Sequence, residues 1–145
     1  MELLTNASIS TAAGVEGDYK GAKYPRRQIT ILAIEDWERA INDVGSTLDD
    51  LPWHLRRANI LIEGWDPAKT VGSLVTIGDI HLEVTGLTTP CSRMEEIASG
   101  LLKALWKDGR GGITCRVTKG GVVSLGDYIA TSKVAPGKVP RRLPG

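Results

Sequence analysis

The sequence predicts a mainly β protein, a strand-rich barrel with a few short helices at its periphery. Short segments rich in β-branched residues recur along the 145 residues, and several alternate strictly between apolar and polar side chains. The chain has 17 glycines and no phenylalanine, which indicates many tight turns and a core of isoleucine, leucine, valine and tryptophan. Short strands separated by frequent glycine turns are typical of barrels and sandwiches.

The expected strands follow one another along most of the chain. They are residues 28–34 (QITILAI), 59–65 (NILIEGW), 80–85 (IHLEVT), 113–118 (ITCRVT), 120–125 (GGVVSL) and 127–131 (DYIAT). The segments VTIGDI (75–80) and VSLGDY (123–128) resemble each other, which predicts two similar hairpins with Gly-Asp turns. Gly120-Gly121 is a further expected hairpin turn.

Two helices interrupt the strands. Residues 35–43 place Trp37, Ala40 and Ile41 on one face, so this helix should pack against the core. A second helix is expected from Ser92, because SRME (92–95) matches a capping box and an apolar stripe follows as far as Leu105. Residues 135–145 contain three prolines and little to bury, so we expect a flexible tail after a single domain over residues 1–134.

Composition excludes several functional classes. The net charge is +1 with acids and bases mixed, so nothing favours binding to nucleic acid or to a membrane surface. The N-terminal residues lack the pattern of a signal peptide, and no apolar run is long enough to cross a membrane, so a cytoplasmic location is expected. Cys91 and Cys115 fit no zinc-binding spacing. The oligomeric state is left open.

Cys91 is the principal candidate for chemistry. The segment TGLTTPCSRME (85–95) ends a strand at Pro90 and begins a helix just after the cysteine. Free backbone N–H groups at a helix start favour the thiolate, which is both the nucleophile and the soft-metal ligand. The alternative is that Cys91 is a buried packing residue, as most cysteines are. Cys115 shares its strand face with Ile113 and Val117, so we expect it in the core.

Basic residues form short groups that either cover solvated surface or bind an anion. The groups are Lys23, Arg26 and Arg27, then Arg56 and Arg57, and finally Arg93, Arg110 and Arg116. Arg57 lies where a strand begins, and Arg116 points away from the core side of its strand. Clustered guanidinium groups suit a phosphate, which they bind in a bidentate manner.

Five motifs in order resemble the MOSC domain, a family named for the C-terminal domain of molybdenum cofactor sulfurase. They are VEGDYKG (15–21), RRQITIL (26–32), LRRANILIEG (55–64), VGSLVTIGDIHLEVTGLTTPCSRM (71–94) and GLLKALWKDGRGGITCRVTKGGVVSLGD (100–127). The fold implied is a barrel like the β-barrel domain of pyruvate kinase. Cys91 falls where the family has its key cysteine.

The resemblance implies a reactive Cys91 that either ligates molybdenum or carries a persulfide sulfur. Arg57 and Asn59 would then bind the molybdenum cofactor (molybdopterin), with Arg27, Thr89 or Thr88, and Arg116 as weaker candidates. Pyridoxal phosphate would be found only on a separate cysteine desulfurase. The resemblance implies a MOSC domain that stands alone, so electrons or sulfur are expected from such a desulfurase or from an electron-transfer protein.

Three functions therefore remain open at this stage. The first is a cofactor-binding component of a molybdenum-dependent oxidoreductase, and the second is a sulfurtransferase-like carrier of persulfide sulfur. The third is an interaction module without chemistry. If the first is correct, Arg57, Asn59 and Arg116 should converge with Cys91 on one pocket at the edge of the barrel.

Overall fold

A seven-stranded sheet forms most of the protein in a computed structural model, which describes residues 6–11, 14–15, 28–56, 58–131 and 137–141. The strands lie in the order β10-β9-β5-β6-β7-β3-β4. Only β3 and β4 pair in parallel; the other neighbours are antiparallel. The bounds are β3 (Ile29–Ala33), β4 (Ile60–Ile62), β5 (Leu74–Ile77), β6 (Ile80–Leu87), β7 (Ile113–Lys119), β9 (Tyr128–Ala130) and β10 (Gly137–Lys138).

This sheet is almost closed into a barrel, which confirms the predicted fold class. Glu63, just beyond β4, forms an isolated antiparallel bridge with Lys138 of β10, with N···O distances of 2.8 and 3.1 Å in the two directions. The flexible tail predicted from residue 135 is therefore wrong over residues 137–139, where β10 pairs and Val139 is buried. The sequence did not predict this strand, which begins with Gly137. A Cβ at that position would lie 2.4 Å from the Cβ of Trp65, so the glycine permits close packing there.

A second, three-stranded sheet joins the first and changes two of the predicted hairpins. It has the order β2-β1-β8, with β1 at Asn6–Ser10, β2 at Gly14–Val15 and β8 at Gly121–Ser124. The β5–β6 hairpin forms as predicted, with Ile77 opposite Ile80. However, β8 pairs with β1 and not with β7 or β9, so the hairpins predicted at Gly120-Gly121 and within VSLGDY are wrong. A Cβ at Gly120 would lie 2.6 Å from the carbonyl oxygen of Ile9, so the glycine permits close approach to β1.

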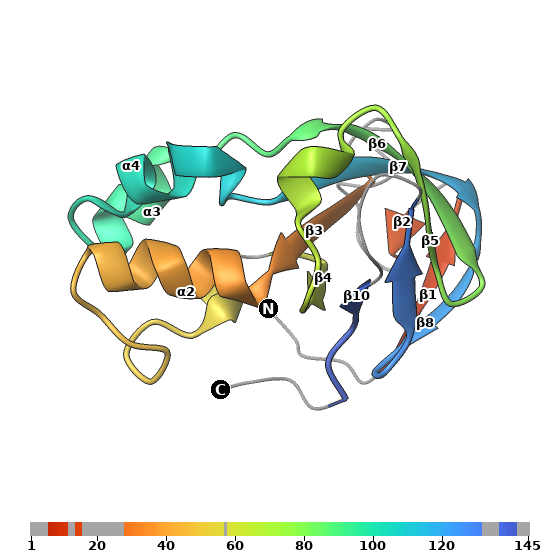
Figure 1. Cartoon of the computed structure of the whole chain (residues 1–145), viewed down its shortest axis with the longest axis horizontal. Coiled ribbons are helices and arrows are strands. Elements are labelled where there is room, and N and C mark those ends of the chain that lie inside the picture. The colour runs from red at the N-terminus through yellow and green to blue at the C-terminus, as the bar shows by residue number, and fades with distance from the viewer. Residues whose placement is uncertain (1–5, 12–13, 16–27, 57, 132–136, 142–145) are drawn as a thin grey trace.

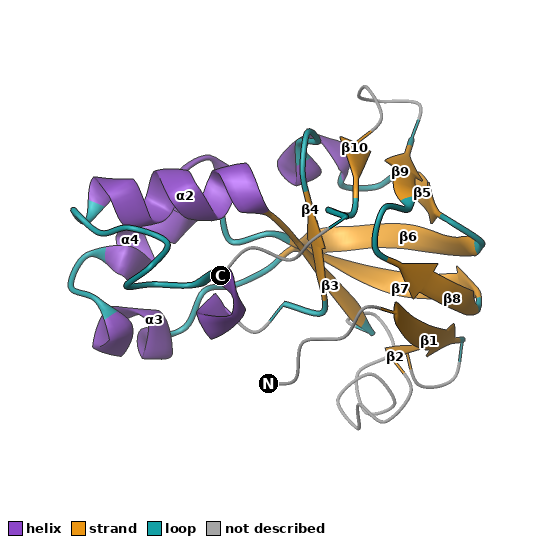
Figure 2. Ribbon diagram, turned by 90° about the horizontal axis from the view of Figure 1, so that it is seen from below, coloured by secondary structure: helices purple, strands orange, loops and turns teal. Residues whose placement is uncertain are grey.

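The helices gather on one side of the barrel, as Figures 1 and 2 show from two directions. They are α2 (Ile34–Asp43), α3 (Ser92–Ile97) and α4 (Leu101–Trp106), with the short helices η2 (Trp53–Arg56) and η4 (Lys107–Gly109), whereas η3 (Pro67–Thr70) lies over the barrel next to β4. Strand β3 separates two cores: Ile29, Ile31 and Ala33 face the barrel interior, whereas Leu32 faces the helices. Trp37, Ala40 and Ile41 of α2 fill the helical core, as their spacing predicted.

The helix predicted from Ser92 is broken into two. Ser92 is the first helical residue and Cys91 is the N-cap, which makes no side-chain capping bond. The Glu95 carboxylate accepts hydrogen bonds from the backbone N–H groups of Gly100 (2.8 Å) and Leu102 (3.3 Å), so it caps α4 instead of closing a box at α3. Gly100 has φ 87°, a conformation that suits glycine and turns the chain between the two helices.

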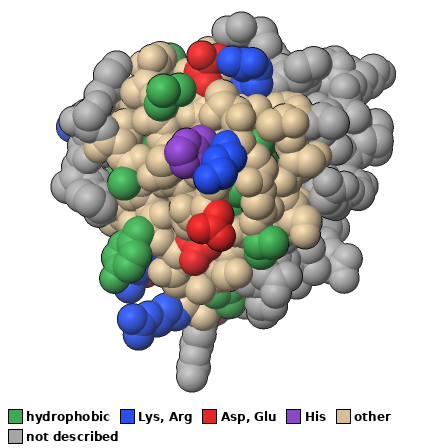
Figure 3. Space-filling view, turned by 90° about the vertical axis from the view of Figure 1, so that its right-hand side faces the viewer, with side chains coloured by type: hydrophobic (Ala, Val, Ile, Leu, Met, Phe, Trp, Pro, Cys, Tyr) green, Lys and Arg blue, Asp and Glu red, His purple; other side chains and the backbone are tan. Residues whose placement is uncertain are grey.

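The face of the barrel turned away from the helices carries mixed side chains (Figure 3). Basic, acidic and hydrophobic groups alternate over it, and the coloured residues include no broad apolar area of the kind that marks a docking surface. Within the described ranges, no helix is long and apolar enough to cross a membrane.

Candidate functional site

Cys91 lies exposed on the segment that leads from β6 to α3. Pro90 before it is buried, and the carbonyl oxygen of Cys91 accepts a hydrogen bond from the N–H of Met94 at 3.0 Å. Met94 is itself almost fully buried in the helical core. The backbone of Cys91 is thus held on both sides while its thiol meets solvent, so the packing alternative does not describe this residue.

A polar hollow of about 170 Å³, which we call the threonine hollow, is lined by Thr89, two residues before this cysteine, whereas Cys91 itself is not a lining residue. The lining residues are Thr30, Arg56, Ala58, Thr88, Thr89, Gly111 and Thr114. Threonine hydroxyls supply most of the polar groups, and no carboxylate is among the lining residues. Such a surface combines one positive charge with polar hydroxyls and has no carboxylate to repel a negative charge, which suits an anionic group.

Arg56 supplies the positive charge of the threonine hollow. Its Nη2 donates a hydrogen bond to Oγ1 of Thr88 at 2.7 Å, and that hydroxyl donates to the carbonyl oxygen of Gly111 at 2.6 Å. The Nε of Arg56 is buried and has no hydrogen-bond partner among the described residues. A buried N–H without a partner carries a desolvation cost of about 1–3 kcal/mol, which a ligand atom that accepts its hydrogen bond would remove.

Cys91 and Arg56 are electrostatically coupled. Burial lowers the pKa of the Arg56 guanidinium from its usual value, and the negative charge of the Cys91 thiolate opposes this decrease. An arginine keeps its proton under any physiological condition, so the hollow retains a permanent positive charge next to the thiol. The arrangement therefore provides a fixed positive charge to which an anionic group of a ligand could bind.

Asn59 shapes the wall of the threonine hollow. Its side-chain oxygen accepts hydrogen bonds from the backbone N–H of Thr30 at 2.8 Å and from the Thr30 hydroxyl at 3.1 Å. The backbone N–H of Asn59 in turn donates to the Thr30 hydroxyl at 3.0 Å. These bonds join the starts of β3 and β4, so Asn59 orients Thr30, which lines the hollow.

The structure brings together only part of the site that the sequence predicted. Thr89 lines the hollow and Asn59 lies behind its wall, whereas Arg116 is exposed on β7 and pairs with Glu83 at 3.3 Å, outside the lining residues. Arg57 and Arg27 lie outside the described residues. Sequence reasoning missed Arg56, Thr30, Thr114 and Gly111. The pair Arg56-Arg57 was visible as a basic group, but composition alone does not tell which guanidinium turns inward.

Cys115 provides the contrast that the strand pattern predicted. It is fully buried in the barrel core, between Thr114 and Arg116 of β7, and burial raises the pKa of its thiol far above the usual value. The described residues contain no group of three or more histidines, cysteines or carboxylates placed to hold a metal ion.

The protein is thus a strand-rich barrel whose candidate site combines an exposed cysteine with an arginine. The chain belongs to the MOSC domain family, whose profile matches residues 18–130. A search among curated protein sequences finds no match.

Several solved structures share this fold. The YuaD protein from Bacillus subtilis superimposes with a TM-score of 0.71 at 23% identity, over 88% of this chain and 85% of that one. YiiM from Geobacillus stearothermophilus gives a TM-score of 0.69 at 17% identity, over 89% of this chain and 61% of that one. YiiM from Escherichia coli gives 0.69 at 16% identity, over 100% of this chain and 67% of that one. The YiiM chains are thus substantially longer than this one, and at these identities the likeness establishes the fold alone.

Proposed function

We propose that this chain acts in sulfur or molybdenum chemistry through Cys91, with the threonine hollow as the binding site for an anionic group of its ligand. The observation that carries the proposal is the exposed Cys91 thiol, electrostatically coupled to an arginine that keeps a buried N–H unpaired at a hydroxyl-lined hollow. A packing cysteine would need neither exposure nor this neighbour.

The residues fit the molybdenum cofactor at two points. The Cys91 thiolate would be the protein ligand of the metal, since thiolates bind molybdenum as soft ligands. Arg56 and Thr89 would hold the anionic phosphate of the cofactor through the unpaired Nε and the Thr89 hydroxyl, while Thr88 keeps Arg56 in position. When bound, the cofactor would supply a redox-active metal centre. Arg57 and Arg27 stay candidates for further phosphate contacts, and Arg116 would first have to leave Glu83.

The runner-up function is a persulfide carrier. The Cys91 thiolate would attack the outer sulfur of a persulfide on a separate cysteine desulfurase, forming a new S–S bond and releasing the desulfurase cysteine as its thiolate. Exposure of Cys91 favours this step, because the thiol has to reach another protein. The threonine hollow favours the cofactor, because a bare sulfur carrier has no need of an anion site.

One expression experiment tests the proposal. The chain would be expressed with molybdate, and bound molybdenum and cyanide-labile sulfur would be measured after purification. Cys91→Ser should abolish whichever is present, because a hydroxyl is neither a soft ligand nor a sulfur acceptor, and circular dichroism should show an unchanged fold.

Two arginine variants distinguish the alternatives. Arg56→Gln should lower bound molybdenum about tenfold, since charge-assisted hydrogen bonds contribute roughly 1.5–3 kcal/mol. The matched control is Arg93→Gln, an exposed arginine close to Cys91 in sequence that does not line the hollow. Labile sulfur that is lost in Cys91→Ser and retained in Arg56→Gln would identify the carrier. A wild-type protein with neither molybdenum nor labile sulfur, even after incubation with a desulfurase and cysteine, would contradict the proposal and favour an interaction module.

A further inference from the structure

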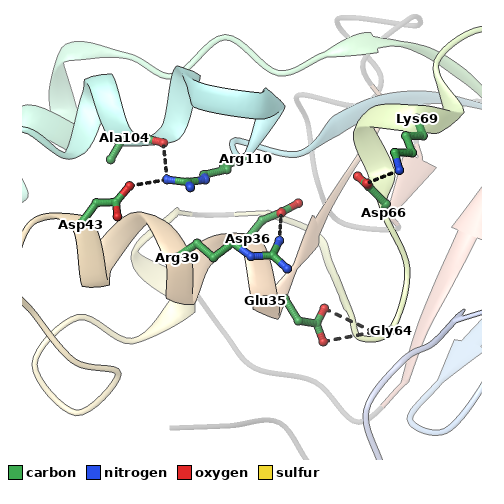
Figure 4. A network of polar contacts seen from close by, with 9 residues as sticks. All are labelled: Glu35, Asp36, Arg39, Asp43, Gly64, Asp66, Lys69, Ala104 and Arg110. Carbon is green, nitrogen blue, oxygen red and sulfur yellow. Dashed lines mark hydrogen bonds and ion pairs between the residues drawn. The ribbon is translucent and has the colours of Figure 1, made fainter.

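A second and larger hollow lies between α2, η3 and η4, and we call it the charged hollow. It has a volume of about 460 Å³ and is lined by Asp36, Arg39, Asp66, Ala68, Lys69, Asp108 and Arg110. Figure 4 shows Asp36 and Arg39 on α2, Asp66 and Lys69 across the space from them, and Arg110 above. Apart from Ala68, the lining residues are three carboxylates and three cations.

Much of this charge is paired within the protein. Arg39 Nη1 lies 3.1 Å from Oδ1 of Asp36, and Lys69 Nζ lies 3.7 Å from Oδ2 of Asp66. Arg110 Nη1 donates to Oδ2 of Asp43 at 2.5 Å, which fixes the arginine against α2. These pairs hold the side chains in place and leave other atoms of the same groups for a ligand.

Two of those remaining atoms are buried and unpartnered. Oδ2 of Asp36 and Nε of Arg110 have no hydrogen-bond partner among the described residues. Each belongs to a side chain that is only 9% exposed. Burial, together with the negative charge of Asp66, raises the pKa of Asp36 to about 6, as expected for a carboxylate that lacks full compensation. One acceptor and one donor are thus left unsatisfied in the same hollow.

We propose that the charged hollow binds a small zwitterion of the α-amino acid class. The ligand's ammonium group would donate to Oδ2 of Asp36, with Asp66 close enough to add attraction, and its carboxylate would accept from Nε of Arg110. This proposal goes beyond the function of the Cys91 site and does not rest on it.

The balance of charges selects this ligand class. A simple anion such as phosphate would meet the unpaired Oδ2 of Asp36 and two further carboxylates, Asp66 and Asp108. A simple cation would meet Arg110, Arg39 and Lys69. Among charged ligands, a molecule that carries both charges can satisfy the unpaired oxygen and the unpaired N–H without repulsion from the other side.

The test is a binding screen with purified protein. Proteinogenic α-amino acids would be added singly at millimolar concentration in a thermal-shift assay, because a ligand that binds only the folded state raises Tm. Each amino acid that shifts Tm would then be compared with two derivatives. Its amide lacks the carboxylate, and its N-acetyl derivative lacks the ammonium group. The expected result is a saturable shift by at least one amino acid and none by its two derivatives.

Variants then locate the binding. Asp36→Asn keeps the shape but removes the charge, and it should weaken the Kd of the selected amino acid about tenfold or more in calorimetry. Glu38→Gln, an exposed position on the same helix outside the hollow, is the matched control and should leave Kd unchanged. Asp108→Asn is a second lining variant; Asp108 has φ 56°, which asparagine tolerates, so folding is preserved.

Two outcomes would overturn the proposal. The first is that no amino acid shifts Tm, or that an amide or N-acetyl derivative binds as well as the parent. The second is that binding persists unchanged in Asp36→Asn. Neither outcome bears on the Cys91 function, because molybdenum and labile sulfur are measured separately.

Discussion

The two hollows lie on either side of one short segment and differ in the kind of charge they contain. Arg110 lines the charged hollow, and the next residue, Gly111, lines the threonine hollow. The threonine hollow has hydroxyls, one arginine and a neighbouring thiol, whereas the charged hollow has opposite charges in equal number. Each contains a buried arginine Nε without a described partner. The surroundings of a guanidinium, and not the guanidinium alone, therefore determine the ligand it favours.

The largest expected effect concerns the thiol, which only the threonine hollow has beside it. Iodoacetamide at neutral pH should modify Cys91 faster than Cys115 by at least about two orders of magnitude, because Cys115 is fully buried and its pKa is raised by burial. Mass spectrometry of peptides from partly alkylated protein gives both rates. Equal rates would mean that the barrel opens readily or that Cys91 is shielded, and would remove the contrast between the two sites.

This difference between the cysteines was readable from the sequence. The alternation in ITCRVT (113–118) places Cys115 inside, and Pro90 ends the preceding strand before Cys91. The barrel, most of its strands and the core face of α2 followed from the same periodic patterns. The predictions that were wrong concern pairings that depend on tertiary contacts. Strand β8 pairs with β1 because Gly120 permits close approach, and β10 pairs beside Glu63 although it has only two residues.

The candidate site was less predictable than the fold. Arg56 enters the threonine hollow because η2 turns it toward Thr88, a direction that a pair of adjacent arginines does not reveal. The sequence did not predict the charged hollow for a related reason. Asp36 is the third residue of α2, a helix whose other polar residues are exposed or half-buried, and the residues that line the hollow with it come from η3, η4 and the segments beside them. Residues that come from separate elements form a site only after the chain has folded.

A smaller effect is expected from one methyl group added at Gly111, which should affect the threonine hollow and not the charged hollow. In Gly111→Ala the new Cβ would lie 2.9 Å from Oγ1 of Thr88, 3.1 Å from Cγ of Pro90 and 3.4 Å from Nη2 of Arg56. The Thr88 hydroxyl, which holds Arg56, must shift and Pro90 must give way slightly, so the affinity of the threonine hollow for inorganic phosphate should fall about tenfold, which corresponds to about 1.4 kcal/mol. Calorimetry with phosphate measures this change, and any amino acid binding in the charged hollow should stay the same.

Gly86→Ala is the matched control for that variant. Its Cβ would have only Oγ1 of Thr114 within 4 Å, at 3.9 Å, so it should leave phosphate affinity unchanged. If Gly111→Ala weakened both phosphate and amino acid binding, the two hollows would act as one site, and the comparison between them would no longer hold.

The smallest expected effect is a pH dependence of stability that arises in the charged hollow alone. Burial raises the pKa of Asp36 to about 6, with Asp66 and Glu35 acting in the same direction and Arg39 and Arg110 against it. The unfolded chain should titrate at about 3.9. Between these values the folded state holds a proton that the unfolded state has released, so the free energy of unfolding should decrease as pH rises from about 4 to about 6.

Asp36→Asn should remove that decrease. At pH near 7 the variant should be more stable than the wild type, on the order of 1 kcal/mol, because the desolvated charge is gone and its exposed partner Arg39 contributes little. At pH near 4 the two proteins should be nearly equal, since Asp36 is then protonated in the folded wild type. Urea unfolding over this pH range gives the difference, with Glu38→Gln as the control. A variant that is less stable at neutral pH would mean that the bond to Arg39 outweighs desolvation, and Asp36 would then be a structural residue, held by the protein and not available to a ligand.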